Sequence, residues 1–327
     1  MNEQSFVRYV DALRALVDKR TKVLSLNGDS RVLREACAHI LKSGGKRVRA
    51  LLLLLSCASV GGTVRRALDA GVAIEAMHDF TLVHDDIMDN AESRRGRPTV
   101  HTLWGRNTAI LTGDVLLGLA YRSLGRTRSH RYRELVDLFT EAVIDVCDGQ
   151  ALDMALAQRT DVSLPEYFSM IARKTGALIA TATAMGGVIG GGTRVEVRAL
   201  QAFGRTLGRA FQVQDDLLDV IAEEKMLGKP IGGDIIEGKK TFLLISAAAR
   251  ARGNDRRLIE LVMRGKAHRE HVAAVTDLYQ RYGILDEAGR RILRDTQTAA
   301  RALDALRPSR AVAVLRWLAG ALVHRVS

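Results

Sequence analysis

The stretch LVHDDIMDN, residues 82–90, sets three aspartates within five positions of a segment that is otherwise largely apolar. An exposed charged surface is not usually framed by leucine, valine, isoleucine and methionine, so the segment is predicted to be largely buried. On a helix, Asp85 and Asp89 stand one turn apart and project from one face. Two carboxylates in adjacent turns repel each other unless a cation lies between them. The stretch therefore predicts a helix that carries a cation site.

The same pattern returns as QVQDDLLDV at residues 212–220, 130 residues after the first copy. This offset is far too long for a solenoid repeat, and it suggests two helices that do the same task from two sides of one cavity. Asp215 and Asp219 repeat the spacing of the first pair. Carboxylate oxygens suit Mg²⁺ or Mn²⁺, and Mg²⁺ shares its coordination shell with water and substrate phosphates. Two facing helices are thus predicted to hold several Mg²⁺ ions around one polyphosphate.

Two other interpretations of the aspartates remain open at this point. An exposed helix face explains a single DDxxD segment, but it explains two copies in apolar surroundings less well. A di-iron bundle needs a Glu-x-x-His element from each of two helices. The sequence offers one such element, Glu75–His78.

Composition predicts an all-α protein of about a dozen helices in a single domain, residues 1–327. Apolar residues make up 47% of the chain, and there are only 4 prolines. Apolar residues recur at helical spacing almost throughout, and clusters rich in glycine, proline and serine are predicted to be loops between helices. Examples of these clusters are KSGGK (42–46), RRGRPT (94–99) and GKPIGGD (228–234).

The net charge of +12 favours an anionic partner such as nucleic acid, anionic lipid or a phosphorylated small molecule, although a solubilising surface also explains part of it. No dense basic tract with interleaved aromatic residues is present, so nucleic-acid binding is not expected. The 3 cysteines match no metal spacing, and buried thiols in a reducing compartment are expected. The apolar run LLLLLSCASV (51–60) is about half as long as a membrane span. We therefore expect a cytoplasmic protein without stable membrane insertion.

Basic residues accompany the acidic segments. GGKRVR (44–49) places Lys46, Arg47 and Arg49 directly after two glycines at the start of an apolar helix, where flexible backbone and cationic side chains suit a diphosphate. Three further groups follow the same pattern: Arg94 and Arg95 in SRRGRPT (93–99), Lys174 and Thr175 in ARKTGAL (172–178), and Lys229, Lys239 and Lys240 in LGKPIGGDIIEGKKT (227–241).

His78 lies seven residues before Asp85, on the same helix face and about 10 Å along the axis. That position suits a second phosphate site. A hydrogen-bonded core histidine is the alternative interpretation.

Together these motifs closely resemble the trans-isoprenyl diphosphate synthase family, also called polyprenyl synthetases. The match runs in the family's order over about residues 40–245, through GGKRVR, EAMHDFTLVHDDIMD, RRGRPT, RKTGAL, FQVQDDLLD, GKPIGGD and EGKKT. The family often has proline after GGKRxR, where this chain has Ala50. The resemblance implies an isoprenoid-synthase fold of roughly ten to thirteen helices around a deep central cavity, usually in a homodimer. It also implies a Mg²⁺-dependent prenyltransferase that joins isopentenyl diphosphate to an allylic diphosphate.

The resemblance also implies roles for single residues. Three aspartates would bind Mg²⁺, three ions to each active site with Mn²⁺ as a substitute, and so hold the allylic diphosphate: Asp85, Asp89 and Asp215. The remaining acids of the two motifs are Asp86, counted among the catalytic residues, Asp216 and Asp219. Contacts to the allylic diphosphate would come from Arg94, Lys174, Lys229 and Lys239. The isopentenyl diphosphate site would consist of Lys46, Arg49, His78 and Arg95. Positions that stabilise the carbocation or assist proton removal match Thr175 and Gln212.

Product length is expected to depend on the residues one and two turns before Asp85, which the family resemblance treats as the floor of the cavity: Met77, Phe80 and Thr81. The bulk of Phe80 predicts a short product, geranylgeranyl (C20) ahead of farnesyl (C15). A longer-chain synthase is an alternative. A terpene cyclase would need one acidic motif and a differently spaced metal triad, and a non-catalytic partner subunit would tend to lose the motifs that are complete here.

Overall fold

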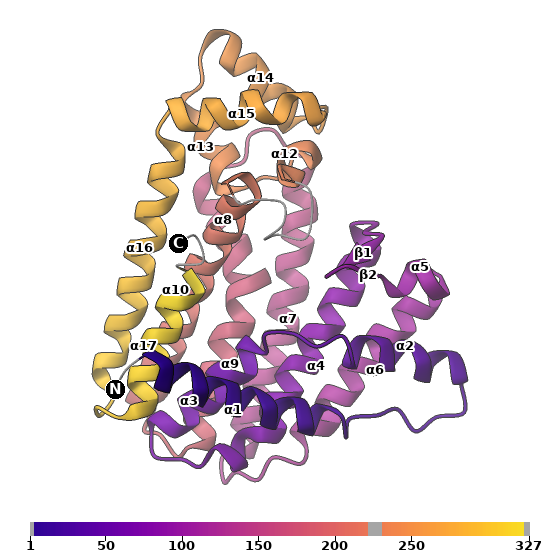
Figure 1. Cartoon of the computed structure of the whole chain (residues 1–327), viewed down its shortest axis with the longest axis vertical. Coiled ribbons are helices and arrows are strands. Elements are labelled where there is room, and N and C mark those ends of the chain that lie inside the picture. Colours follow the sequence, from indigo (N-terminus) through magenta and orange to yellow (C-terminus); the bar gives the residue numbers. More distant parts are fainter. Residues whose placement is uncertain (1–2, 222–230, 324–327) are drawn as a thin grey trace. The chain divides into compact units, whose positions relative to one another are not determined.

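The computed structural model describes residues 3–221 and 231–323, and their regular secondary structure is helical apart from one short hairpin (Figure 1). The all-α prediction is therefore confirmed. The hairpin pairs β1 (Ser93–Arg94) with β2 (Arg97–Pro98) in antiparallel register. It replaces the loop predicted at residues 94–99. Its two turn residues, Arg95 and Gly96, have φ of 54° and 72°, as tight two-residue hairpin turns require.

The chain divides into two compact units. The first comprises residues 1–143, 178–204 and 302–317, and the second comprises residues 144–177, 205–301 and 318–327. The first unit holds α1 (Glu3–Thr21), α2 (Arg31–Leu41), α3 (Val48–Ser59), α4 (Val64–Met88), α5 (Val100–Trp104), α6 (Arg106–Leu124), almost all of α9 (Ala177–Ile189), and η2 (Leu303–Ala305). The second holds α8 (Leu164–Ile171), the π-helix η1 (Ala172–Gly176), α12 (Gly233–Glu237), α13 (Phe242–Arg250), α14 (Gly253–Met263), α15 (Arg269–Arg281) and almost all of α16 (Ile284–Ala302). Three helices begin in the first unit and end in the second: α7 (Tyr132–Ala157), α10 (Arg194–Ile221) and α17 (Arg310–Val323). A single domain over residues 1–327 stays a prediction.

The first unit is built around α4, a helix of 25 residues that packs against both α3 and α6. Because α4 has neighbours on two sides, its apolar residues are not confined to one stripe. The run of leucines from Leu51 to Leu55 is buried throughout and forms the middle of α3. This run is thus a core helix, and in the described parts of the chain no helix is long and apolar enough to cross a membrane.

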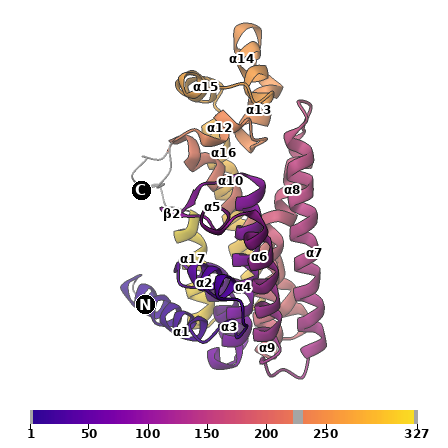
Figure 2. The same cartoon turned by 90° about the vertical axis from the view of Figure 1, so that its right-hand side faces the viewer.

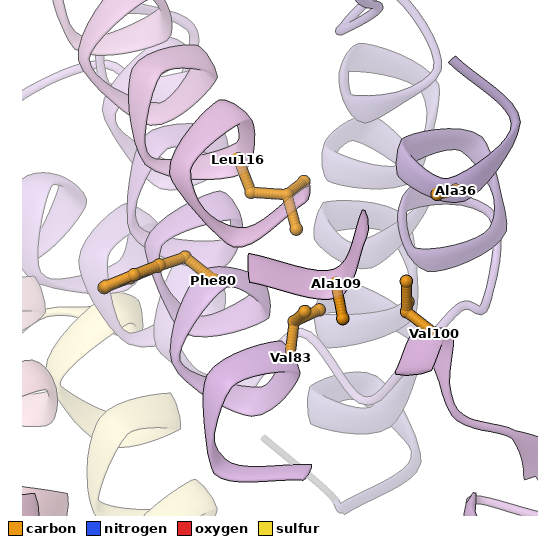
Figure 3. Packing of buried hydrophobic residues seen from close by; sticks show 6 residues of the cluster. All are labelled: Ala36, Phe80, Val83, Val100, Ala109 and Leu116. Atoms are coloured by element: carbon orange, nitrogen blue, oxygen red, sulfur yellow. The ribbon is translucent and has the colours of Figure 1, made fainter. Parts of the chain in front are cut away.

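An apolar cluster joins the C-terminal half of α4 to α6, α5 and α2 (Figure 3). Phe80 and Val83 come from α4, Ala109 and Leu116 from α6, Val100 from α5 and Ala36 from α2. It holds the end of α4 that carries the first acidic motif.

In the second unit, α12, α13, α14 and α15 pack together beyond the end of α10 (Figure 2). Lys240 stabilises this group from inside. Its buried Nζ donates to the carbonyl oxygens of Gly238 at 2.7 Å, Met263 at 2.8 Å and Ala157 at 3.3 Å. Its three acceptors lie within the protein, which makes Lys240 a structural residue.

The prediction that all three cysteines are buried is wrong for one of them. Cys37 and Cys57 are buried, and burial raises the pKa of both thiols to about 11. Cys147 is exposed on α7. The apolar spacing of α7 resembles that of its neighbours, so the sequence pattern did not distinguish its outer face.

Candidate active site

The first acidic motif lies at the C-terminal end of α4, where its three aspartates have different surroundings. Asp85 is half-buried and Asp89 is exposed. The backbone N–H of Asp89 donates to the carbonyl of Asp85 at 2.8 Å, so the one-turn spacing persists where the helix ends. Asp86 is only 3% exposed and faces another side of the helix. The structure therefore confirms the predicted helix and leaves Asp85 and Asp89 as the pair on the outer side.

Asp86 holds the hairpin against α4. Arg94 Nε donates to Asp86 Oδ1 at 2.6 Å. Burial raises the pKa of Asp86, while the charge of Arg94 opposes that shift. The predicted contact of Arg94 with the allylic diphosphate stays a prediction. The contact to Asp86 shows what keeps its guanidinium beside the motif.

The second acidic motif lies near the end of α10 and is divided in a similar way. Asp216 is buried and accepts from Tyr167 Oη at 2.6 Å, Gln212 Nε2 at 3.0 Å and the backbone N–H of Phe242 at 3.2 Å. Asp219 is also buried and accepts from the backbone N–H of Asp234 at 2.9 Å, in the first turn of α12. Only Asp215 of the three is exposed. This is the residue that the resemblance implied as a metal ligand.

Thr175 and Gln212 lie together, as their shared predicted role requires. Thr175 Oγ1 donates to Gln212 Oε1 at 2.7 Å, and the amide Nε2 of Gln212 donates onward to Asp216. Thr175 belongs to the π-helix η1, which the sequence did not predict. Its wider turn is held closely by α7, because a Cβ on Gly149 would stand 2.2 Å from the backbone nitrogen of Lys174.

Two predicted lysines of the second unit are paired with acids. Lys174 Nζ lies 2.6 Å from Asp153 Oδ2, and Lys239 Nζ lies 3.3 Å from Asp234 Oδ1. Burial opposes the charged form of Lys239, but nearby carboxylates, Asp234 first among them, raise its pKa above the ordinary value. The ion pairs hold both lysines in the second unit, where Asp215 and Asp216 also contribute to the raised pKa of Lys239. Lys229 lies outside the described residues.

The residues predicted to bind isopentenyl diphosphate gather in the first unit. Arg49 belongs to the first turn of α3, and its buried Nε has no hydrogen-bond partner among the described residues. Arg95 extends from the hairpin and donates to the carbonyl of Gly44 at 2.9 Å. Burial, with the charges of Arg49 and Arg95, holds the pKa of His78 well below its usual range. Lys46 is exposed beside them. His78 is therefore neutral among cations, an arrangement suited to an anionic ligand.

Sequence reasoning gave no role at this site to Arg47, Glu75 or Asp79, although it placed Arg47 in the basic loop GGKRVR and noted Glu75 before His78. Arg47 has φ of 51°, a conformation that is costly for arginine, and it is held by Asp18 Oδ1 at 2.9 Å and by Glu75 Oε2 at 3.8 Å. Asp79 is 4% exposed, and the positive charges of Arg47, Arg49 and Arg95 lower its pKa against the effect of burial. The available signal was the pair of acids Glu75 and Asp79, one turn apart beside His78. We call Arg47, Arg49 and Arg95 the arginine cluster.

The predicted chain-length residues all lie on α4. Met77 is fully buried, and Phe80 is 7% exposed and packs edge-on against His84 with ring centroids 4.9 Å apart. Thr81 is half-buried, and its hydroxyl donates to the carbonyl of His78 at 2.8 Å. Phe80 thus presents a rigid apolar surface about one turn from Asp85. A role as the cavity floor stays a prediction.

The donor chemistry fits a divalent ion. Within residues 3–221 and 231–323, no group of three His, Cys, Asp or Glu side chains could hold a metal by itself. Mg²⁺ is commonly bound by one or two carboxylates, with water and substrate phosphate completing the shell. The carboxylates of Asp85, Asp89 and Asp215 are hard oxygen donors of this kind. The first two belong to the first unit and the third to the second, so the facing of the two motifs across one cavity stays a prediction.

Comparison with known proteins decides the family. Residues 30–279 match the polyprenyl synthetase family. The chain belongs to this family. A short-chain isoprenyl diphosphate synthase from Methanothermobacter thermautotrophicus is 40% identical over 312 residues, which cover 95% of each chain. The membership expected from the motifs and the transferase class are both confirmed, and the family uses divalent metal ions and isoprenoid diphosphates.

Solved structures of other polyprenyl synthetases have the same fold. A geranylgeranyl pyrophosphate synthetase from Pyrococcus horikoshii gives a TM-score of 0.93 at 38% identity, over 99% of this chain and 100% of that one. A polyprenyl synthase from Caulobacter crescentus, solved with calcium and isoprenyl diphosphate, gives a TM-score of 0.91 at 27% identity. That match covers 100% of this chain and 98% of the other.

Proposed function

We propose that this polyprenyl synthetase uses Mg²⁺, or Mn²⁺ in its place, to join isopentenyl diphosphate head-to-tail to an allylic diphosphate. We propose geranylgeranyl diphosphate as its product. The observation that carries the proposal is the arrangement of α4. This helix bears a pair of outward carboxylates at its end and, about two turns earlier, a neutral His78 surrounded by arginine charges. Such a helix offers one place for a metal-bound diphosphate and another for a diphosphate bound by cations alone.

Different groups of side chains would bind the two substrates. Divalent ions held by Asp85, Asp89 and Asp215 would supply positive charge that stabilises the departing diphosphate. His78, being neutral, can donate one N–H to the second diphosphate beside the arginine cluster. Thr175 and Gln212 offer oxygen atoms of fixed orientation, because Gln212 also donates to Asp216. These oxygens would stabilise the allylic carbocation, and the released diphosphate would accept the proton that leaves.

The proposed C20 product rests on the position of Phe80. The ring is buried in the cluster of α4 and α6, where Leu116 and His84 restrict its movement. A side chain held in this way would stop a growing chain that approaches along α4. The similarity to the geranylgeranyl pyrophosphate synthetase from Pyrococcus horikoshii supports the same product length.

We also propose a homodimer. The outer face of α7 exposes Ile144, Cys147 and Met154 at helical spacing, and residues Ile144 and Met154 are 55% and 53% exposed. An apolar stripe of this kind on one helix fits a second copy of the same chain. Light scattering of the purified chain gives its mass, and Ile144→Glu with Met154→Glu should yield monomers.

Product analysis tests the proposed reaction. The protein is incubated with labelled isopentenyl diphosphate and, in parallel, dimethylallyl, geranyl or farnesyl diphosphate, with Mg²⁺, with Mn²⁺ or with EDTA. We expect labelled C20 diphosphate from each primer and none with EDTA. Hydrocarbon from an allylic diphosphate alone would indicate a cyclase, and complete inactivity with every primer would indicate a partner subunit.

A further inference from the structure

Three acids lie along one side of α4, and only the outer two have a strong partner. Glu75 accepts from the backbone N–H of Ala50 at 2.9 Å. Asp86 accepts from Arg94 at 2.6 Å. Asp79 lies between them, seven residues before Asp86 and four after Glu75. Its Oδ2 is buried and receives no hydrogen bond from any described residue.

The surroundings of Asp79 contain charges of both signs. Glu75 and the neutral His78 flank it on α4, Arg47 and Arg49 approach from the start of α3, and Arg95 approaches from the hairpin. A buried carboxylate that lacks a donor is costly, whereas a carboxylic acid in the same place is less so. Burial and the charge of Glu75 raise the pKa of Asp79 to about 7, against the opposing charges of the arginine cluster.

The balance between the charged and the neutral form of Asp79 depends on which negative groups lie near the arginine cluster. Without a ligand, the cluster faces the two carboxyl groups of Glu75 and Asp79. A diphosphate bound to the cluster brings further negative charge to the same cations. It thereby weakens their attraction for Asp79 and adds repulsion, and both effects favour the neutral acid.

We propose that Asp79 is a positioning residue that takes up one proton from the buffer when isopentenyl diphosphate binds, leaving the arginine cluster to the diphosphate. This inference rests on the proposed function, because it assumes that this ligand binds here. The carboxylate accepts the proton at one oxygen and becomes a carboxylic acid, and no other bond forms or breaks. Binding of the second substrate therefore weakens as pH rises above neutrality.

Calorimetry of the full chain with isopentenyl diphosphate alone measures the proton directly. Titrations at pH 8 in two buffers of different ionisation enthalpy give the number of protons exchanged. The wild-type protein should take up about one proton more than Asp79→Asn, since the amide cannot be protonated. Asp29→Asn, which removes an exposed carboxylate of the first unit, should behave as wild type.

The pH dependence gives a second readout. Between pH 7 and pH 9, the wild-type dissociation constant should weaken by up to about tenfold per pH unit relative to that of Asp79→Asn. In steady-state kinetics, KM for isopentenyl diphosphate should rise with pH more in wild type than in Asp79→Asn, whereas kcat of the two proteins should stay nearly equal. A purely structural role for Asp79 would not produce a pH-dependent effect on KM without an effect on kcat.

A spectroscopic measurement on the unmutated protein covers the case in which the variant fails to fold. The infrared difference spectrum between bound and unbound protein should gain a carboxylic-acid carbonyl band. Equal proton uptake in wild type and Asp79→Asn, or a difference spectrum without this band, overturns the role of Asp79 alone. Failure of the wild-type protein to bind isopentenyl diphosphate at any pH overturns the proposed function as well.

Discussion

Gly113 of α6 lies so close to His84 of α4 that a Cβ on the glycine would stand 2.2 Å from His84 Nε2. The ring cannot easily move away. Its Nε2 donates to the carbonyl of Ile110 at 3.1 Å, and Phe80 packs against it edge-on. His84 precedes Asp85, so the separation of α4 and α6 is set next to the first acidic motif.

Gly113→Ala should therefore destabilise the protein, by about 1–3 kcal/mol, because the added methyl group forces the imidazole out of its contacts. Gly118→Ala on the same helix is the matched control. No atom lies within 4 Å of a Cβ placed there, so the alanine should stabilise α6 by about 0.5–1 kcal/mol. Urea unfolding of the two variants measures both effects, and a Gly113→Ala protein as stable as wild type would contradict the close packing.

The first acidic motif should separate activity from stability. Asp85→Asn is expected to lower kcat at least about 100-fold with little change in Tm, because it removes a proposed metal ligand. Asp86→Asn is expected to cost about 1–3 kcal/mol of stability, since it removes the charge of a buried partner of Arg94. Thermal unfolding and initial rates on the same preparations provide the comparison. Loss of activity in Asp86→Asn, together with loss of stability in Asp85→Asn, would show that Asp86 is the metal ligand.

In the second motif, loss of activity and loss of stability are also expected from substitutions at different residues. Asp215→Asn should reduce activity without unfolding the chain, because Asp215 is exposed. Tyr167→Phe removes the hydroxyl that donates to Asp216 at 2.6 Å and should cost about 1–3 kcal/mol. Circular dichroism melts with product assays measure the two quantities. Loss of stability in Asp215→Asn would count against its role as a ligand.

Phe80→Ala should lengthen the main product by one or more isoprene units, because the buried ring is proposed to end the chain. Leu116→Ala removes a neighbouring side chain of the same cluster and controls for loosened packing. Both variants should lose stability, by about 2–5 kcal/mol. Mass analysis of the prenyl diphosphates distinguishes them, and unchanged C20 product from Phe80→Ala would remove this residue from the floor.

Asp79 also makes stability depend on pH. Its pKa is about 7 in the folded protein, against an ordinary value of 3.8 for an aspartate in an unfolded chain, so the folded state binds more protons between these values. The stabilisation is fully present below about pH 4 and is lost as pH rises through 7. Asp79→Asn should abolish this loss and raise Tm at pH 8 by several degrees, whereas at pH 5 the difference should be smaller. A Tm difference that does not change with pH would exclude the titration of Asp79.

Much of the site could be predicted from sequence because it lies in short helical segments. The one-turn spacing of Asp85 and Asp89, and the place of His78 on the same helix, follow from helix geometry alone. The all-α fold followed from apolar residues at helical spacing. The family followed from ordered motifs that keep their residue types.

The partners of these residues could not be read from the sequence. Asp86 and Asp216 have the same residue type as their neighbours, yet Arg94 and Tyr167 engage them from segments outside their own helices. The π-helix at Ala172–Gly176 likewise packs closely on α7, and Arg94 and Arg95 of the hairpin bond to residues of other segments.

The sequence by itself determined which side chains share a helix face, because that depends only on the period of the helix. The tertiary structure decided which acids are buried, which cations meet them, and that Glu75 and Asp86 have hydrogen-bond donors whereas Asp79 Oδ2 has none among the described residues. The reason is physical: burial and charge pairing arise from contacts between separate segments of the chain, and a local pattern does not contain them.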